Sequence, residues 1–492
     1  MTALSKRDQT VFEIEEIDGI YYLAYSEGTH LEHKPISSFD KERKDVWDFY
    51  NALCWEVPGK IDPYRGGRVD PYNPETIKAW ILDTANDIIR YSNERIFFKD
   101  DRYSAILVSF VFNTILKELF DFAPRLILSG ATNSGKSRLL GLLQQLCYRA
   151  YYSIRPTFSI MFRLLNMYGV TLLIDEAQRL KKDARSDVED IFLNGTTKNA
   201  RISRTNPNSM KVESFAIYGP MAISNKAGGF TAEDIDNRSF KLNFIPKKGF
   251  ISPRDDMDEL KRIRTDLYSI RALFMLRPDC IDFNAMIDKA YEELTQTDDN
   301  GYLLSDFLRA DGIKGKRLAN RSLQIATTYY TLSKLTSTEP EILSFLTEED
   351  ENNAERQRNT LEGMVFRAYV RCCGNSRDIQ KYDYLDRMTS VTSKEIRDEY
   401  NNELYNSGNK ATNFDEIQTN KVTRIMNDIG LTMERSTAHH NNSVVRRTAD
   451  LEECLEINED RYATEEENAI LCTLRDKRGP IIKRPKKVNV ES

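Results

Sequence analysis

The chain has 492 residues, of which 40% are hydrophobic and 30% are charged, and its formal net charge is −6. This length predicts about three domains with hydrophobic cores, and the charge excludes a protein that coats nucleic acid through overall basicity. Seven cysteines without a C-x-x-C pair favour a reducing, cytoplasmic location without a zinc site, and four histidines make a histidine-based metal site unexpected. We expect neither a signal peptide nor a membrane span, since the longest apolar helix candidate, 105–120, is short and carries polar residues.

The N-terminal stretch predicts a small α+β domain over residues 1–74. Residues 11–26 alternate between apolar and polar around Asp18-Gly19, which is typical of a β-hairpin, and a helix is expected near 41–55. The stretch 58–74 is rich in proline, glycine and aspartate and predicts a linker.

Two helices, over about 76–92 and 101–120, lead into the most informative motif of the chain. Its eight residues fit G-x-x-x-x-G-K-[ST] and are Gly130, Ala131, Thr132, Asn133, Ser134, Gly135, Lys136 and Ser137. An apolar strand, 126–129, precedes the motif, and an apolar helix that begins at Arg138 follows it. This is the context of a phosphate-binding loop. We therefore predict that 130–138 bind ATP, with Lys136 on the β- and γ-phosphates and Ser137 on Mg²⁺.

A second apolar run, 170–176, ends in Asp175 and Glu176. The carboxyl ends of parallel strands meet at one edge of a sheet, so these carboxylates are expected beside the phosphate loop. Asp175 is then a candidate for the Mg²⁺ shell, and Glu176 is a candidate for polarising the attacking water.

A third run, 216–223, is followed by Ser224 and Asn225. Asn225, with Ser224 as second choice, is a candidate for holding the attacking water, and the alternative is a simple turn after a strand. Arg238 precedes an alternating strand and is a candidate arginine finger that acts on a neighbouring subunit. The alternative for Arg238 is a local ion pair with Asp234 or Asp236.

Residues 198–214 predict a second hairpin with little acidic balance. Its four cations are Lys198, Arg201, Arg204 and Lys211. In a ring ATPase such a hairpin can enter the central pore and contact nucleic-acid phosphates, and the alternative is an ordinary solvated surface.

The order of these motifs resembles that of the AAA+ ATPases of archaeal plasmids, viruses and mobile elements. Those proteins are related to superfamily-3-type, primase-linked replicative helicases. The resemblance covers about 75–250 well and 251–335 loosely, and implies a P-loop AAA+ core with preceding helices in a homo-oligomer, expected to be a hexamer. It matches Lys136, Ser137, Asp175, Glu176 and Arg238 to the family's ATPase residues. Asn237 stands where the family has aspartate, and 1–75 is too short for a primase domain.

The C-terminal part predicts a helical region over 251–375 and a winged-helix-like domain over 376–460. A helix at 392–400, a helix at 414–431 and two strands at 432–436 and 443–448 have the winged-helix order. The cations expected to reach DNA are Lys421, Arg424, Arg446 and Arg447. A purely structural role for this module is the alternative. Residues 461–492 predict a basic, disordered tail.

These expectations favour an ATP-hydrolysing oligomeric DNA translocase or helicase that acts in DNA replication. The alternative is a nucleotide-gated DNA-binding initiator, loader or defence switch that does not unwind DNA. A metabolic P-loop kinase is disfavoured, because it would need neither the hairpin nor a winged helix.

Overall fold

The computed structural model describes residues 11–177, 182–205, 210–226, 238–297, 320–375, 384–406, 416–436, 439 and 442–476. The chain divides into two compact units, Met1–Asp350 and Glu351–Ser492.

The first unit opens with a three-stranded antiparallel sheet of order β1-β2-β3. The strands are β1 (Phe12–Ile17), β2 (Ile20–Glu27) and β3 (His30–Pro35), and α1 (Lys44–Asn51) follows after a short 3-10 turn, Ile36–Ser38. The predicted hairpin is confirmed, with Ile17 paired to Ile20 across the turn. The third strand was not predicted, because its sequence, HLEHKP, has little β-branched or aromatic character.

The stretch expected to be a linker, 58–74, is anchored to the rest of the first unit. Before α2 (Pro74–Arg95) begins, it contains no helix or strand apart from the 3-10 turn Arg65–Gly67. Gly59 N–H donates to Thr265 Oγ1 at 2.7 Å, and Ile61 is fully buried. Arg149 also forms a buried ion pair with Glu13 of β1 at 2.9 Å. The N-terminal sheet and this stretch are therefore packed against the rest of the first unit.

A larger sheet has five parallel strands and is the centre of the first unit. In spatial order the strands are β10 (Ser239–Phe244), β4 (Arg125–Gly130), β9 (Met221–Asn225), β6 (Thr171–Ile174) and β5 (Ala150–Ser153). All five regions were expected to hold strands or apolar runs except β5. β9 begins only at Met221, because Gly219-Pro220 interrupts the run from 216 and proline has no N–H to donate.

Buried side chains alternate between the two faces of this sheet. Leu126 and Leu128 of β4 belong to one hydrophobic cluster, whereas Ile127 belongs to another on the opposite face. Such a strand is apolar on both faces, as expected for a parallel sheet that is covered on both sides.

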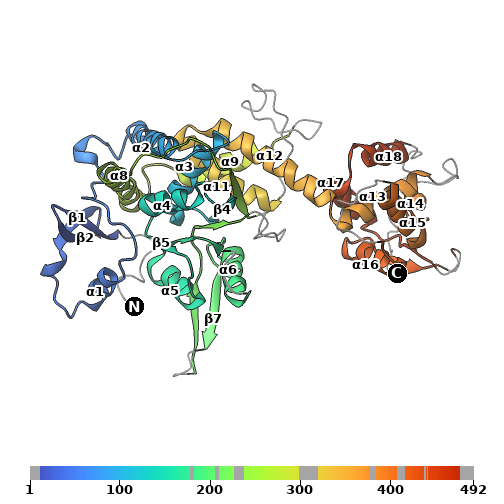
Figure 1. Cartoon of the computed structure of the whole chain (residues 1–492), viewed down its shortest axis with the longest axis horizontal. Coiled ribbons are helices and arrows are strands. Elements are labelled where there is room, and N and C mark those ends of the chain that lie inside the picture. The colour runs from blue at the N-terminus through green and yellow to red at the C-terminus, as the bar shows by residue number, and fades with distance from the viewer. Residues whose placement is uncertain are drawn as a thin grey trace, which may run out of the picture. The chain divides into compact units, whose positions relative to one another are not determined.

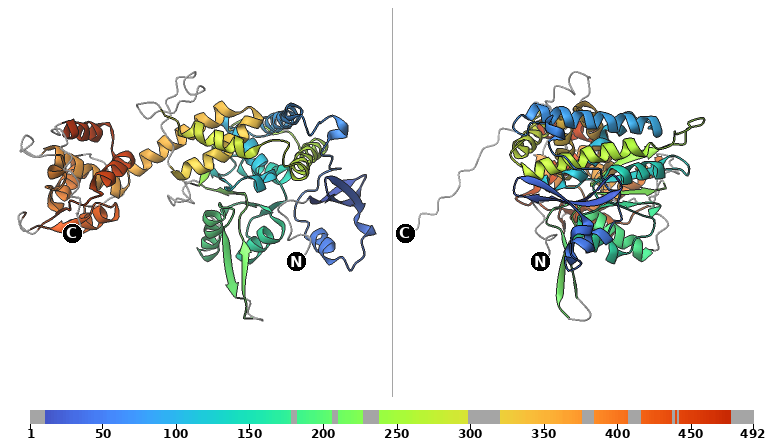
Figure 2. Two further views of the ribbon diagram at one scale, coloured as in Figure 1. Left: turned by 180° about the vertical axis from the view of Figure 1, so that it is seen from behind. Right: turned by 90° about the vertical axis from the view of Figure 1, so that its left-hand side faces the viewer.

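Helices cover both faces (Figures 1 and 2). On one side lie α2 (Pro74–Arg95), α3 (Arg102–Ile115), α4 (Lys136–Leu146), α8 (Met257–Leu276), α9 (Phe283–Thr295) and α11 (Asn320–Thr336). On the other lie α5 (Phe158–Tyr168) and α6 (Lys182–Asn194). The predicted second hairpin is present as β7 (Arg201–Thr205) and β8 (Val212–Ala216), and it projects from the body in both figures. α12 (Glu339–Arg358) includes the boundary between the units.

The second unit is mainly helical. Its elements are α13 (Leu361–Asn375), α14 (Tyr384–Met388), α15 (Ser393–Asn406), α16 (Thr419–Asp428), β11 (Met433–Arg435), β12 (Ser443–Val445), α17 (Leu451–Tyr462) and α18 (Glu465–Asp476). Thr392 and Glu395 form a capping box at the start of α15: each side chain accepts from the other's backbone N–H. β11 and β12 are antiparallel, and Thr392 forms a further isolated bridge with Val444.

Two expectations for this unit need correction. α16 begins at Thr419 rather than near 414, since 416–418 are not helical. Residues 465–476, expected in a disordered tail, form α18, whose Leu471 and Leu474 are buried. Two features explain why this acidic segment folds: apolar residues three apart lie on one helix face, and the Glu467 carboxylate accepts from the N–H and the hydroxyl of Thr464 at the start of the helix. Residues 477–492 lie outside the described part of the chain.

Candidate functional site

The loop 130–137 connects β4 to α4 at the carboxyl end of the five-stranded sheet. Gly130 has a φ of 151°, and a Cβ there would lie 2.2 Å from the carbonyl oxygen of Phe244. Gly135 has a φ of 100°, in the left-handed region that L side chains rarely adopt. Asn133 also has a positive φ, 60°, which asparagine tolerates better than most residues. The loop therefore requires both of its glycines in order to bring its backbone against β10 and into the start of α4.

Lys136 is the first residue of α4, and its side chain folds back over the loop. Its Nζ donates to the carbonyl oxygens of Gly130, at 2.8 Å, and Ala131, at 2.6 Å. Burial lowers the pKa of the Lys136 ammonium, and the nearby Asp175 carboxylate partly offsets this effect. The ammonium thus donates to uncharged carbonyl oxygens. It would form stronger hydrogen bonds with a negatively charged acceptor.

The Asp175 carboxylate lies at the end of β6 and is only 5% exposed. Its Oδ1 accepts from the Ser224 hydroxyl and, at 2.9 Å, from the Glu176 N–H, whereas its Oδ2 accepts from Tyr152 Oη at 2.8 Å. Burial alone would raise the pKa of Asp175, but hydrogen bonds from Ser224, Tyr152 and Ser137 lower it. Asp175 is therefore an ionised carboxylate that contacts Ser137 of the loop, as predicted from parallel strand ends.

Glu176, the residue after Asp175, has an unusual backbone conformation. Its φ is +53°, which is uncommon for a residue other than glycine. Its N–H donates to Ser224 Oγ at 3.1 Å as well as to Asp175. A strained conformation held by two hydrogen bonds is a feature that clusters at functional sites.

Asn225 and Ser224 end β9 between β4 and β6. In the register Asn225 is level with Ser129, one residue before Gly130, and it is 2% exposed. Ser224, the second choice in the sequence analysis, is the residue that contacts both Asp175 and Glu176.

A pocket of about 430 Å³ opens beside the loop, which is within the range of small-molecule sites. Asn133, Ser134 and Gly135 form one wall, and the ends of α2 and β10 and the segment 250–254 form the others. In this pocket the ring centroids of Phe97 and Phe250 lie 6.1 Å apart, and Lys247 Nζ is 4.9 Å from the centroid of the Phe97 ring. Aromatic faces and cations next to a glycine-rich loop suit a flat ring that carries phosphates.

Arg138 ties the loop to the wall of this pocket. Its guanidinium makes a two-pronged ion pair with Asp255, at 2.9 and 3.0 Å, and also donates to the Pro253 carbonyl. Tyr91 Oη in turn donates to Asp255 at 3.2 Å. The start of α4 and the segment 253–255 are thereby held together.

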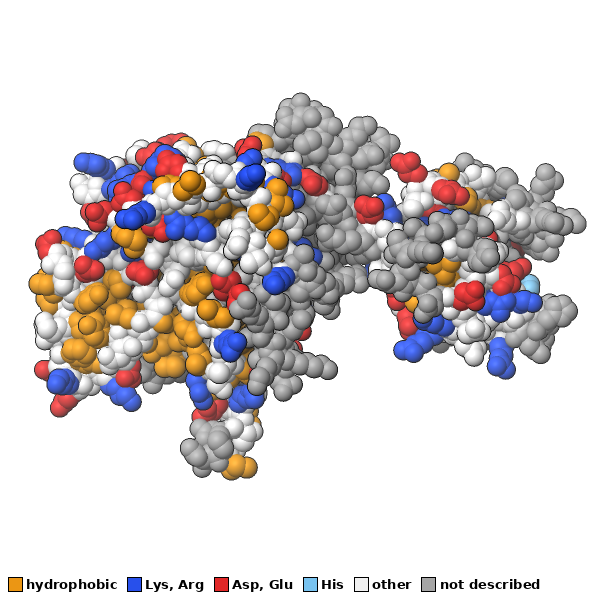
Figure 3. Space-filling model, viewed as in Figure 1, with side chains coloured by type: hydrophobic (Ala, Val, Ile, Leu, Met, Phe, Trp, Pro, Cys, Tyr) orange, Lys and Arg blue, Asp and Glu red, His pale blue; other side chains and the backbone are white. Residues whose placement is uncertain are grey.

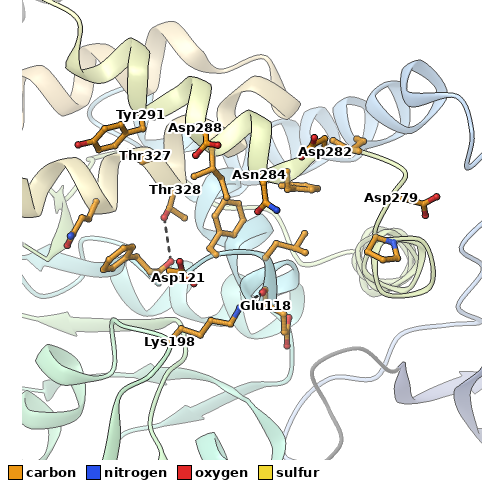
Figure 4. A pocket seen from close by; sticks show the side chains of 18 residues that line it. Glu118, Asp121, Lys198, Asp279, Asp282, Asn284, Asp288, Tyr291, Thr327 and Thr328 are labelled. Carbon is orange, nitrogen blue, oxygen red and sulfur yellow. Dashed lines mark hydrogen bonds between the residues drawn. The ribbon is translucent and has the colours of Figure 1, made fainter.

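A larger pocket, of about 1060 Å³, lies at the other end of β4 (Figure 4). Its charged lining residues are Glu118, Asp121, Lys198, Asp279, Asp282 and Asp288. Five carboxylates against one ammonium make this pocket unsuited to phosphate. Burial would raise the pKa of Glu118, but Arg271 and Lys117 hold it at about 2. We therefore place the candidate site at the smaller pocket.

Arg238 lies directly before β10, at the amino end of the sheet. Ser239 pairs with Arg125 and Phe244 with Gly130, so six residue steps, roughly 20 Å at about 3.3 Å each, separate Arg238 from the loop of its own chain. Its guanidinium donates to the carbonyl of Leu193. At this distance Arg238 cannot contact a nucleotide bound at the loop of its own chain. Its role as an arginine finger toward a neighbouring subunit stays a prediction. Asp234, Asp236 and Asn237 lie outside the described residues.

The hairpin cations do not share one environment. Lys198 Nζ donates to the Glu118 carbonyl at 2.8 Å in the acidic pocket. Arg201 donates to Ser214 Oγ at 2.8 Å, and Arg204 lies 4.6 Å from the Phe158 ring of α5. Lys211 is exposed. Figure 3 shows basic and hydrophobic side chains together on this hairpin, where Met210 and Val212 are also exposed.

The four predicted cations of the second unit are all exposed. Arg424 is 3.8 Å from Asp428, and Arg446 is 3.6 Å from Glu434. Arg447 is 2.7 Å from Asp386. Exposed pairs of this kind are worth ~0–1 kcal/mol, so they leave the arginines able to exchange partners.

The described residues offer neither a cluster of metal ligands nor a helix that could span a membrane. They contain no group of three or more His, Cys, Asp or Glu side chains placed to hold a metal ion. Among the helices described, none has the length and apolar character needed to cross a bilayer. Comparisons with protein-family models and with curated protein sequences gave no match.

Sequence analysis missed Tyr152, Asp255 and the two phenylalanines of the smaller pocket. Only the neighbourhood of β5 and β6 could have indicated Tyr152, since adjacent parallel strands end side by side. Asp255 and Phe250 lie in an irregular segment more than 110 residues after the loop, and no local pattern marks them.

Proposed function

We propose that this chain is a Mg²⁺-dependent ATPase. The observation that carries the proposal is the meeting of loop 130–137 with Asp175 and Glu176 at one edge of a parallel sheet. Backbone N–H groups at the start of α4 suit a triphosphate, and the pocket with Phe97 and Phe250 suits its base. Ser137 and Asp175 would hold Mg²⁺, which supplies charge neutralisation on the phosphates when it is bound.

The residues of the chain have separable roles in this proposal. Lys136 would exchange its bonds with Gly130 and Ala131 for the β- and γ-phosphate oxygens, where a charge-assisted bond is stronger. The Glu176 carboxylate would orient the attacking water and accept its proton, and Asn225 would be available to hold that water. Ser224 would keep the backbone of Glu176 in its strained conformation.

We further propose that ATP hydrolysis drives a homo-oligomer, expected to be a hexamer, along DNA. The projecting hairpin supports this proposal, as does the helix–helix–strand–strand order of α15, α16, β11 and β12, which is that of a winged helix. Lys421 and Arg424 lie on the second helix of that order, and Arg446 and Arg447 follow its last strand. Arg238, at the far end of the sheet, would serve the site of a neighbouring subunit.

One observation favours the alternative of a DNA-binding switch that does not unwind. Lys198, Arg201 and Arg204 already have partners within the chain, on Glu118, Ser214 and Phe158. Cations held by partners within the chain contribute less to binding the phosphates of a DNA strand as the protein moves along it.

The test is ATP hydrolysis with and without single-stranded and duplex DNA, for the wild type and for Glu176→Gln. Stimulation by single strands that is lost in Glu176→Gln would support a translocase. Hydrolysis that depends on Glu176 but ignores DNA would favour the switch. The double variant Arg201→Ala, Arg204→Ala then distinguishes the translocase from the switch. The control is Lys289→Ala, which removes an exposed cation of α9.

A further inference from the structure

Tyr152 has no role in the proposed chemistry, yet it contacts the carboxylate on which that chemistry depends. Its hydroxyl donates to Asp175 Oδ2 at 2.8 Å. Tyr152 lies on β5, the edge strand, and pairs in register with Leu173 of β6. The pairing continues one step further, because Asp175 N–H donates to the Ser153 carbonyl at 3.0 Å. The end of β5 therefore fixes both the backbone and the side chain of Asp175.

The hydrogen bonds of Asp175 divide between its two oxygens. Oδ1 accepts from Ser224 Oγ and from Glu176 N–H, both of which come from the β6–β9 side. Oδ2 accepts from Tyr152, on the β5 side. The Tyr152 hydroxyl is therefore the β5 side-chain group that limits rotation of the carboxylate about its Cβ–Cγ bond.

We propose that Tyr152 is a positioning residue, whose hydroxyl holds the Asp175 carboxylate in one orientation toward Ser137 and a Mg²⁺ ion. This inference rests on the proposed function. Groups that hydrogen-bond to a metal ligand typically change metal affinity or activity by about 10- to 100-fold when they are removed.

The chain offers a matched control in the adjacent Tyr151. It is also half-buried on β5, but it packs against the opposite hydrophobic cluster rather than against Asp175. Tyr151→Phe and Tyr152→Phe each remove one hydroxyl from the same strand and leave the ring in place. A general weakening of β5 would affect both variants, whereas a positioning role affects only Tyr152→Phe.

The experiment measures the Mg²⁺ concentration that gives half-maximal binding of a fluorescent, non-hydrolysable ATP analogue. We expect Tyr152→Phe to raise this concentration about 10- to 100-fold, with Tyr151→Phe at the wild-type value. Binding of the analogue in EDTA should be the same in all three proteins. A wild-type Mg²⁺ midpoint in Tyr152→Phe, or a lower one, would overturn the inference.

Two further results keep the interpretation unambiguous. In an Asp175→Asn background, Tyr152→Phe should add no further loss, since it acts through the carboxylate. A full additional loss there would also contradict the inference. Failure of the proposed function would be seen differently, as a wild-type protein that does not bind the analogue at any Mg²⁺ concentration.

Discussion

The two ends of the five-stranded sheet both bury charged groups, but they compensate those charges in different ways. At the amino end buried ion pairs compensate the charges: Arg149 is paired with Glu13, at 2.9 Å, and Arg271 is paired with Glu118. At the carboxyl end Lys136 bonds to uncharged oxygens of its own loop, the carbonyls of Gly130 and Ala131 and the Ser134 hydroxyl, and Asp175 bonds to hydroxyls and one N–H.

This difference separates charges that hold the fold from charges that can serve a ligand. A buried ion pair whose partners come from the protein is complete, and removing one partner leaves the other uncompensated. An ammonium on loop carbonyls can exchange its partners for phosphate oxygens at little cost. Substitutions at the carboxyl end should therefore change activity, and substitutions at the amino end should change stability.

The largest expected effect is that of Lys136→Ala on ATP hydrolysis. Removing one preorganised charge from a transition state typically costs about 10²- to 10³-fold in rate. The free energy of unfolding should barely change, because burial lowers the pKa of this ammonium and the fold does not favour its charge. Phosphate release and urea denaturation measure the two quantities. Wild-type hydrolysis, or a loss of several kcal/mol in stability, would contradict the assignment.

The opposite result is expected for Glu118→Gln at the amino end. Leaving Arg271 without its carboxylate should lower the free energy of unfolding by about 3 kcal/mol, with ATP binding unchanged. The pKa of Glu118 is about 2 in the folded chain, below an unfolded value of about 4.3. Its contribution to stability is thus complete above about pH 4.3 and is lost as the pH falls toward 2.

Urea denaturation of the wild type and of Glu118→Gln across this pH range tests the sign. The gap between the two proteins should be widest at neutral pH and should close toward pH 2. A constant gap would show that the charge of Glu118 is not responsible.

Two glycines within twelve residues sharpen the comparison. Gly130→Ala places a Cβ 2.2 Å from the Phe244 carbonyl, and should lower stability by roughly 1–3 kcal/mol and abolish nucleotide binding. Gly141→Ala, in α4, meets no atom within 4 Å and should raise stability by about 0.5–1 kcal/mol. Thermal unfolding with and without Mg²⁺ and ATP measures both effects. Equal behaviour of the two variants would refute the close approach of the loop to β10.

The smallest expected effect is that of Asp255→Asn on nucleotide affinity. Its pair with Arg138 is more than one-third exposed, so its loss should weaken ATP binding only a few-fold. Binding of inorganic triphosphate should not change, because the pair supports the wall of the base pocket rather than the loop. Competition of the two ligands against a fluorescent nucleotide makes the comparison, and equal weakening of both would argue against this division of roles.

Local patterns predicted the elements that local sequence controls. The loop 130–137, the strand directly before Asp175 and the second hairpin are all where the sequence indicated. The capping box at Thr392 likewise depends on residues three apart. In each case the residues that determine the structure are neighbours along the chain.

The remaining features depend on the strand order β10-β4-β9-β6-β5, which no local pattern encodes. This order brings Tyr152 and Ser224 to Asp175 from strands 23 and 49 residues away along the chain. The smaller pocket similarly combines α2, the loop and the segment after β10. Residues 461–492 were predicted to form one basic, disordered tail, whereas Leu471 and Leu474 of α18 pack into a core made with residues far away along the chain.

The most direct test of the central claim is a single-turnover measurement of phosphate formation from bound ATP, for the wild type and for Glu176→Gln in Mg²⁺. We predict that both proteins bind ATP, that the wild type converts it to ADP and phosphate, and that Glu176→Gln retains it intact. If Glu176→Gln forms phosphate at the wild-type rate, the carboxyl end of the sheet is not the site of hydrolysis.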